Sequence, residues 1–262
     1  MRKKKIAPAE KASVYSAPAL TKGLRVLELL ASSARPFTQT EIARALGRTS
    51  GELYRMLAVL EQEGYVHKDG FGGYSLTLKL LTLGHGSRHL DILLNTARGF
   101  MREYSWRSGE ECHLSVLEDG RLTVIAHESG SGPVSLLVKT GSTHHPLRTA
   151  SGRLLLAHCT EEDRAWHLKR AVVHFSGEAA EAGAVCEPAV FEGIFRQGYS
   201  EATGESHRGV VDTAYPVGDD TTPVRAALAS SRFPEVGGRA CTSAARALLE
   251  TAARNITRAL RE

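Results

Sequence analysis

The chain has 262 residues, 42% of them hydrophobic, which is enough for two domains that each bury a core. It has no run of about 18 apolar residues and no apolar segment behind its basic start, so we expect a cytoplasmic protein without membrane span or signal peptide. Cys112, Cys159, Cys186 and Cys241 form no C-x-x-C pair, so we expect neither a zinc knuckle nor a disulfide framework. The net charge is +4. Residues 1–90 hold fourteen Lys or Arg against seven Asp or Glu, a net of +7, which leaves −3 for the remainder. This asymmetry favours contact of residues 1–90 with a polyanion.

Residues 1–17 show no apolar period and are predicted to form a disordered basic tail. The cluster Arg2–Lys5 either adds nonspecific phosphate contacts or only solvates the tail, and chance on solvated faces explains the charge asymmetry equally well. From Thr21, the spacing of Leu24, Leu27 and Leu30 predicts a helix that packs on two later helices and ends at Pro36.

Two consecutive helix-start signals follow. Thr38 with Glu41, and Thr49 with Glu52, are T-x-x-E sequences that predict capping boxes. Gly47 between them fits the left-handed end of the first of these helices. The pattern is typical of a helix-turn-helix.

In the second of these helices, Leu53, Leu57 and Leu60 mark the core side, so the side chains at its start are free to face a DNA major groove. The next segment, GYVHKDGFGGYSLT, predicts two short strands joined by glycine turns, which is a hairpin. Three helices and a hairpin predict a winged helix-turn-helix over residues 18–84, with the wing tip at Lys68–Gly73.

The rest of the chain predicts a linker helix over residues 85–106 and a second domain over residues 107–262. In the second domain the expected elements are a hairpin in ECHLSVLEDGRLTVIAHES, a strand in PVSLLVK, a loop running into a helix in GSTHHPLRTASGRLLLAH, a helix capped by Thr160, a helix in EPAVFEGIFRQGY, strands in GVVDTAYPV and PVRAALASS, and a last helix from Thr242. Strands bracketed by helices predict an α+β sensor-like domain.

Together these segments resemble the IclR family of bacterial transcriptional regulators, from about Thr21 to the end of the chain. The N-terminal match lies in TKGLRVLELL, TEIARALGRTSGELYRMLAVLEQEGYV and YSLT, and the more specific C-terminal match in TGSTHHPLRTASGRLLLA and GYSEATGESHRGVVDTAYPV. The resemblance implies a winged helix-turn-helix, a linker helix used in dimerisation and a C-terminal GAF-like α/β domain that binds a small effector, without a cofactor. It also implies a homodimer or dimer of dimers on a palindromic double-stranded operator.

The resemblance and the wing assign residues to two sites. The expected DNA contacts are Gln39, Thr40, Arg48, Thr49, Ser50, Glu52, Tyr54 and Arg55, with His67 and Lys68 of the wing as phosphate or minor-groove candidates. The expected effector contacts are Ala150, Ser151, Gly152, Asp212 and Ser230. The chain departs from the family pattern at Gly51-Glu52, Asp212 and Leu228, so neither the bases read nor the effector class can be transferred.

Several of these residues have alternative roles. Arg48 or Arg55 suits a guanine edge, and Glu52 suits a cytosine amino group, but completing the capping box is the simpler role of Glu52. Tyr54 either contacts a phosphate or packs under the wing. Ser151 is either an effector contact or a helix N-cap.

The segment TASGR places small residues at a helix start, where free amides suit a carboxylate or polar oxygen. Asp212 in the same cavity would disfavour a second anion and favour a hydroxyl, amine or hydrazine-like donor, so the expected effector is a small polar or aromatic metabolite with a donor. His144 and His145 would face opposite ways in a strand, so no shared metal is expected.

No catalytic site is expected. Gly204–Gly209 has one residue too many for a G-x-S-x-G elbow, and Ser206 beside His207 in sequence does not place an imidazole behind the hydroxyl. A nonspecific architectural DNA binder would need basic residues throughout. We therefore expect a ligand-responsive transcriptional regulator, a repressor of a catabolic operon or alternatively an activator of the same architecture, and much less a small-molecule hydrolase.

Overall fold

The computed structural model describes residues 17–84, 88–132, 136–175, 187–205, 207–222, 225–233 and 243–262. The chain divides into two compact units, Met1–Gly86 and Ser87–Glu262, each of which is described by itself. The predicted basic tail lies outside the described residues except for Ala17, and so do Cys186, Ser206 and Cys241.

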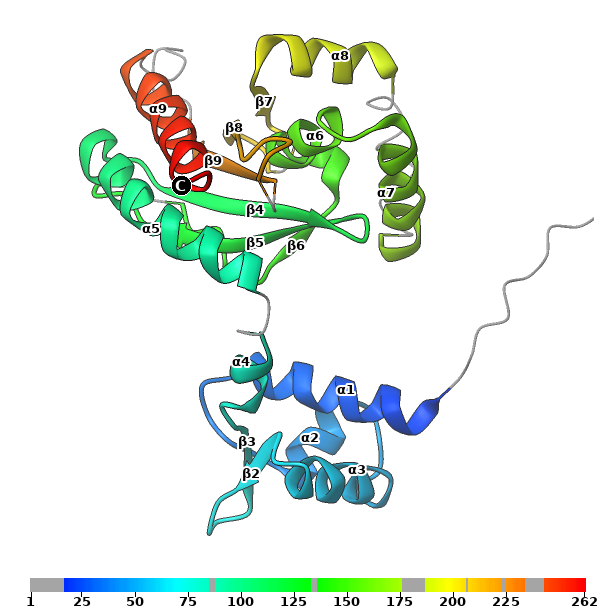
Figure 1. The fold of residues 1–262 in the computed structure, drawn as a ribbon. Helices are drawn as coiled ribbons and strands as arrows, with labels where there is room; N and C mark the ends of the chain where they lie inside the picture. The colour runs from blue at the N-terminus through cyan, green and yellow to red at the C-terminus, as the bar shows by residue number, and fades with distance from the viewer. Residues whose placement is uncertain are drawn as a thin grey trace, which may run out of the picture. The chain divides into compact units, whose positions relative to one another are not determined.

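The first unit is a winged helix-turn-helix (Figure 1). Its elements are α1 (Pro18–Ala31), β1 (Phe37–Thr38), α2 (Gln39–Ala45), α3 (Ser50–Gln62), β2 (Val66–Lys68), β3 (Gly73–Leu76) and α4 (Lys79–Gly84). The strands form an antiparallel sheet in the order β1-β3-β2, in which β1 was not expected from the sequence. The buried core side chains are Val26, Leu30, Ile42, Ala43, Leu53, Leu57, Val66 and Tyr74.

Both predicted capping boxes are present. The Thr38 hydroxyl accepts from the Glu41 amide at 3.3 Å, and the Thr38 amide donates to Glu41 Oε2 at 2.8 Å. The Thr49 hydroxyl accepts from the Glu52 amide at 3.3 Å, and the Thr49 amide donates to Glu52 Oε2 at 3.1 Å. Gly47 has a φ of +61°, as its place after α2 predicts.

The first helix differs from its prediction. It begins at Pro18 and ends at Ala31, before Pro36, with the Ser32 hydroxyl donating to the Leu29 carbonyl at 2.7 Å. Leu24 is 50% exposed, so its predicted place in the core is wrong. Val26 takes that place, since residues two apart lie about 200° apart around a helix.

The second unit is built on one six-stranded sheet in the order β6-β5-β4-β9-β8-β7, in which every neighbouring pair is antiparallel. Its elements are α5 (Arg88–Ser108), β4 (Cys112–Glu118), β5 (Arg121–Glu128), β6 (Thr143–His144), η1 (Pro146–Arg148), α6 (Ala150–Ala157), α7 (Glu161–His174), α8 (Pro188–Gln197), β7 (Ser200–Thr203), β8 (Val211–Val217), β9 (Ala226–Arg232) and α9 (Ser243–Ala259).

The strand predicted over residues 133–139 is wrong for its described part, since residues 136–139 form no strand. The neighbouring β5 pairs instead with the segment that follows: Val124 donates to the Ser142 carbonyl at 3.0 Å, and Gly141 donates back to Val124 at 2.7 Å. The short strands β6 and β7 were also missed, because two to four residues carry too little alternation to recognise.

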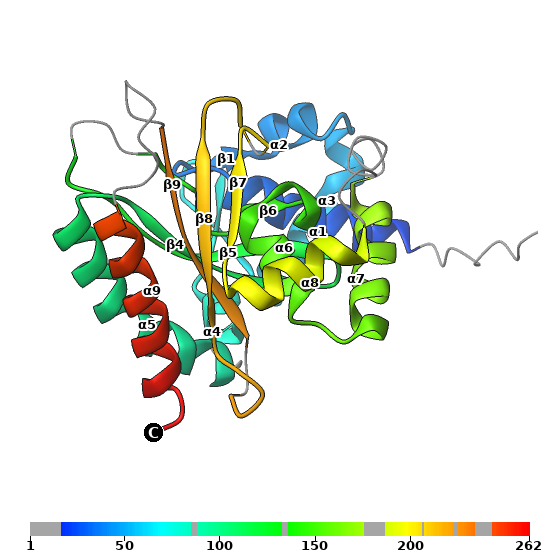
Figure 2. The same cartoon turned by 90° about the horizontal axis from the view of Figure 1, so that it is seen from above.

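The sheet separates two cores, with α5 and α9 on one face and α6 and α8 on the other (Figure 2). The first core contains Leu93, Ala97, Met101, Tyr104, Cys112, Leu114, Tyr215, Val217, Ala226, Leu228, Leu249, Ala252, Ala253 and Ile256. The second contains Leu122, Leu147, Ala150, Leu154, Leu155, Leu156, Ala157, Phe191, Ile194, Ala202, Ala214, Ala227 and Ala229. Side chains of β8 and β9 alternate between them, as period-two strands require.

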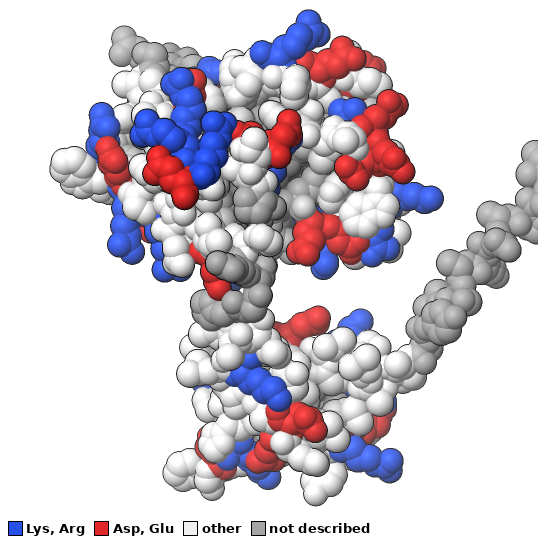
Figure 3. Space-filling view, viewed as in Figure 1, with Lys and Arg blue, Asp and Glu red and all other residues white. Residues whose placement is uncertain are grey.

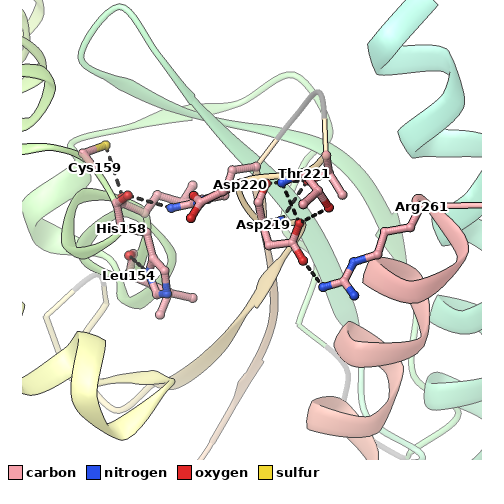
Figure 4. A network of polar contacts seen from close by, with 10 residues as sticks. Leu154, His158, Cys159, Asp219, Asp220, Thr221 and Arg261 are labelled. Atoms are coloured by element: carbon pink, nitrogen blue, oxygen red, sulfur yellow. Dashed lines mark hydrogen bonds and ion pairs between the residues drawn. The ribbon is translucent and has the colours of Figure 1, made fainter.

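The β8–β9 connection is tied to the helices on both faces (Figure 4). Arg225 donates to the His158 carbonyl at the end of α6 at 2.6 Å and forms an ion pair with Asp220. On the other side Arg261 forms an ion pair with Asp219, whose pKa is lowered to about 2 by hydrogen bonds from Thr221 and by Arg261. These contacts fix the C-terminal end of α6, whose N-terminal end lies at the cavity described below.

Candidate DNA-binding surface and effector cavity

The start of α3 is held from inside the domain. Gln39 is half-buried, and its amide donates to the Ser50 carbonyl at 2.8 Å. It therefore joins the first turn of α2 to the first turn of α3. Thr40, beside it, is exposed.

The Glu52 side chain accepts hydrogen bonds at both of its carboxylate oxygens. Oε2 accepts from the amide and hydroxyl of Thr49, and Oε1 accepts from Lys22 of α1 at 2.8 Å. Lys22 and Thr49 together lower the pKa of Glu52 to about 2. Of its two interpretations, the capping role is the one present, with an anchor to α1 that the sequence did not reveal.

The candidates Arg48, Tyr54 and Arg55, around the first turns of α3, face solvent. Arg48 and Arg55 are exposed, and neither guanidinium forms an ion pair with another described residue. Tyr54 is 62% exposed, so it does not pack under the wing. Cations and a phenol free at the start of a recognition helix suit base edges and phosphates.

The wing carries a fixed tip. Asp69 Oδ1 accepts from the amides of Phe71 and Gly73, both at 2.8 Å. His67 and Lys68 are exposed, and Phe71 at the tip is 99% exposed, a position that sequence reasoning did not single out. On the face visible in Figure 3, Lys and Arg lie among Asp and Glu, so this face presents no continuous basic surface.

The second domain contains a cavity of about 490 Å³ at the start of α6. It is lined by His113, Leu122, Val124, Leu136, Leu137, Val138, Lys139, Ser142, His144, Thr149, Ala150, Ser151, His207, Arg208, Val210, Asp212, Ser231 and Phe233. Buried polar side chains such as His113, Ser151 and Asp212 form the inner wall, while Lys139 and Arg208 are exposed at the mouth. The size suits a small molecule.

Three of the five predicted effector contacts, Ala150, Ser151 and Asp212, line this cavity. Gly152 does not: a Cβ there would lie 2.2 Å from the Pro146 carbonyl oxygen, so the glycine serves the close approach of α6 to η1. The N-cap of α6 is Thr149, which accepts from the Gly152 amide at 3.1 Å, so the N-cap interpretation of Ser151 is wrong.

Ser230 was also placed at the effector site, and the structure puts it on the opposite face of β9. There its hydroxyl donates to Glu110 at 3.0 Å. The next residue, Ser231, lines the cavity and donates to Asp212. A shift of one residue in a strand moves a side chain to the other face, and the sequence did not fix which serine faced inward.

Sequence reasoning missed much of the polar lining. His207 and Arg208 lie in the GESHRG segment that was weighed as a catalytic motif, and they line the cavity instead. The loop is held by buried Arg153, which forms an ion pair with Glu205 and donates to the Glu201 carbonyl at 3.0 Å. His113 had no sequence signal, since it lies in an ordinary strand pattern.

The adjacent histidines have separate partners. His144 lies 2.9 Å from the Ser142 hydroxyl, and Nδ1 of His145 accepts from the Leu147 amide at 3.2 Å. Within the described residues, no cluster of His, Cys, Asp and Glu is arranged to hold a metal ion. Likewise, none of the helices described is long and apolar enough to cross a membrane.

Comparison with known proteins gives a consistent result. Residues 19–70 match the IclR helix-turn-helix domain, and residues 87–258 match the bacterial transcriptional regulator IclR C-terminal domain. The glycerol operon regulatory protein of Streptomyces coelicolor is 28% identical over 207 residues, covering 76% of this chain and 78% of the relative. The transcriptional regulator KdgR of Dickeya chrysanthemi is 30% identical over 228 residues, covering 83% and 72%.

Solved structures show the same architecture. An IclR transcriptional regulator from Alicyclobacillus acidocaldarius superposes with a TM-score of 0.68 at 25% identity, covering 94% of this chain and 99% of that one. An IclR homologue from Microbacterium hydrocarbonoxydans, solved with 4-hydroxybenzoate, gives a TM-score of 0.74 at 24% identity, covering 93% and 99%. These two relatives are named as an operon regulatory protein and a transcriptional regulator, and both family models describe IclR regulators. This chain belongs to the IclR family of bacterial transcriptional regulators.

Proposed function

We propose that the protein is a ligand-responsive repressor that binds a palindromic operator as a dimer or dimer of dimers. A small molecule in the second-domain cavity releases it. The observation that carries this proposal is the combination of two features in one chain: free arginines at an outward-facing recognition helix, and a cavity with buried polar walls. An effector acts by binding the DNA-releasing state better than the DNA-bound state.

The proposed DNA contacts are the exposed side chains around the start of α3. Arg48 and Arg55 would supply base or phosphate contacts, and Tyr54 a phosphate contact. The wing residues His67 and Lys68 would add backbone contacts. Gln39 and Glu52 support the helix from within, so we assign them to positioning it.

The lining of the cavity favours a hydroxylated aromatic acid. Leu122, Val124 and Val210 offer an apolar wall for a flat ring. The start of α6 and the cations at the mouth suit an anionic oxygen, while Asp212 suits a donor. The 4-hydroxybenzoate complex of the Microbacterium protein supports this class.

The second copy would meet the exposed leucines of the first domain. Leu20 and Leu24 share one face of α1 and are 63% and 50% exposed, and Leu78 and Leu81 near α4 are 75% and 58% exposed. Such apolar surface favours a partner. The predicted linker helix, described from Arg88 as α5, packs Leu93 and other residues into its own domain's core, which leaves less of it for dimerisation.

A two-step experiment on the full chain tests the function. Duplexes selected from a random pool would first define the operator. Anisotropy titrations would then measure operator affinity with and without 4-hydroxybenzoate, other hydroxylated aromatic acids, small keto acids and amides. We expect a compound that stabilises the chain to weaken operator binding at least fivefold, a coupling of about 1 kcal/mol. A ligand that tightens binding would instead indicate an activator, and selection without sequence preference would contradict the proposal.

A further inference from the structure

Behind the cavity wall lies a buried carboxylate that the proposed function does not use. Glu111, directly before β4, is 2% exposed and does not line the cavity. Its Oε1 accepts from the Ser231 amide, and its Oε2 lies 3.4 Å from Nδ1 of His113 and 3.3 Å from Nε2 of His127. One carboxylate therefore contacts two lining residues, His113 and Ser231, from behind.

The contacts of Glu111 reach two more lining residues. Ser231 donates to Asp212 on the neighbouring strand, and the backbone of Leu136 is bonded to His127. Burial opposes ionisation of Glu111, but His113, His127 and the Ser231 amide outweigh it and hold its pKa below the ordinary value. Glu111 in turn raises the pKa of His127. Glu111 is thus a buried carboxylate that favours its ionised form, and it stabilises the imidazolium form of His127 beside it.

We propose that Glu111 is a positioning residue that makes the inner wall of the cavity hydrogen-bond accepting, so that it selects effectors presenting a hydroxyl, amine or amide N–H. This inference rests on the proposed effector binding. An ionised carboxylate has no proton to give, so its contact with His113 places the proton on Nδ1. In its neutral form the ring then leaves Nε2 without a proton, and because His113 lines the cavity, that nitrogen can accept from a ligand there.

Asp212 provides a second hydrogen-bond acceptor on the same wall of the cavity. It lies on β8, separated from His113 on β4 by the strand β9 that carries Ser231. Ser231 donates to both acidic groups: its backbone amide donates to Glu111 and its hydroxyl to Asp212. A ligand carboxylate at this end would meet two acceptors, whereas a hydroxyl or amine can donate to one of them.

Four para-substituted benzoates separate these cases: 4-hydroxy, 4-amino, 4-methoxy and 4-carboxy. Calorimetric titration of the full chain should give about tenfold tighter binding for the two donors than for the other two. In Glu111→Gln the amide N–H can donate to Nδ1, which moves the ring proton to Nε2. The preference should then narrow or turn towards 4-methoxybenzoate.

The matched control is Glu110→Gln. Glu110 accepts from Tyr104 at 2.8 Å and from Ser230 at 3.0 Å on the opposite face of the sheet, so its amide variant should keep the donor preference. If Glu111→Gln does not fold, His113→Phe keeps a ring but removes the acceptor and should lose the preference. The inference is overturned if the wild type binds the four compounds with equal affinity. It is also overturned if folded Glu111→Gln or His113→Phe keeps the wild-type preference. In both cases the proposed effector binding itself is not contradicted.

Failure of the proposed effector class gives a different result. If no benzoate binds, that class is wrong, and histidine C2–H exchange measured by mass spectrometry on the ligand-free chain tests whether Glu111 acts on the histidines beside it. The exchange midpoint of His127 should move to lower pH in Glu111→Gln, because the charge that favours its imidazolium is gone. An unchanged midpoint overturns the role of Glu111.

Discussion

The two domains use their carboxylates in opposite surroundings. In the DNA-binding domain, Glu41 and Glu52 lie near solvent and each bonds a threonine three residues earlier. In the effector domain, Glu111 and Asp212 are buried, and each accepts from Ser231, which lies 120 residues from Glu111 and 19 residues from Asp212. The first arrangement shapes a helix that is presented outward, and the second shapes a wall that faces inward. The domain that would read DNA is thus organised locally, and the domain that would read a metabolite is organised by strand pairing.

The largest expected effect is a change in the free energy of unfolding. It comes from substituting two helical glycines, Gly152 in the effector domain and Gly51 in the DNA-binding domain. A Cβ at Gly152 would meet the Pro146 backbone at 2.2 Å, whereas one at Gly51 meets nothing within 4 Å. Gly152→Val should lower the free energy of unfolding of the effector domain by ~1–3 kcal/mol or more, since a backbone cannot yield as a flexible side chain can. Gly51→Ala should stabilise its helix by ~0.5–1 kcal/mol. Urea unfolding measures both, and a destabilised Gly51→Ala would contradict the open surroundings of α3.

Next in size is the removal of a free arginine from the recognition helix. Arg55→Ala should cost ~1–3 kcal/mol of operator affinity, about 5-fold to 150-fold, and leave the melting temperature unchanged because the guanidinium has no ion pair to lose among the described residues. Arg98→Ala, an exposed arginine on α5, is the control. Equal operator affinities of the two variants would remove α3 from the DNA interface.

A smaller effect is expected at the helix caps. Thr49→Ala removes the hydroxyl that accepts from the Glu52 amide, and should destabilise the DNA-binding domain by ~1 kcal/mol. Thr160→Ala removes the corresponding cap of α7, where the hydroxyl accepts from the Asp163 amide at 3.1 Å. Hydrogen exchange resolves the two domains, and each variant should raise exchange only in its own.

The smallest effect is a pH dependence confined to the effector domain. The pKa of Glu111 is lowered, so its stabilisation is present above its ordinary value of 4.5 and is lost as pH falls through its folded pKa. The pKa of His127 is raised by Glu111, the Leu136 backbone and Glu128, so its stabilisation is present below 6.5 and is lost as pH rises through its folded pKa. His113 also faces the pair.

Their joint contribution is therefore largest between pH 4.5 and 6.5. Urea unfolding of the wild type should show a loss of stability as pH rises above 6.5, and this loss should be smaller in Glu111→Gln. Identical pH profiles of the two proteins would show that the pair does not stabilise the domain.

Local signals predicted the helix-turn-helix at the centre of the DNA-binding domain. The two T-x-x-E sequences and the glycine between them predicted the starts of α2 and α3 and the turn that joins them. The capping role of Glu52 was also favoured, but its ion pair with Lys22, thirty residues away, carries no local signal. Leu24 was misplaced because leucine spacing alone does not distinguish a buried stripe from an exposed one.

The effector site was less predictable because its residues come from strands far apart in the chain. Ala150, Ser151 and Asp212 were placed at the cavity by the family resemblance, whereas Ser230 missed it by one residue of strand register. Glu111 and His113 are two residues apart, but they meet His127 and Ser231 because β4 pairs with β5 and β9. Such proximity depends on tertiary pairing, which no short motif encodes.

The central claim is that the cavity and the recognition helix act on one equilibrium. Operator affinity of the full chain, titrated with the compound that binds the full chain most tightly, tests it most directly when Asp212→Asn is measured beside the wild type. The account predicts that the ligand weakens wild-type operator binding at least fivefold, and that the variant binds the operator normally but loses the response. An operator affinity that stays constant as the ligand saturates the wild-type protein would contradict it.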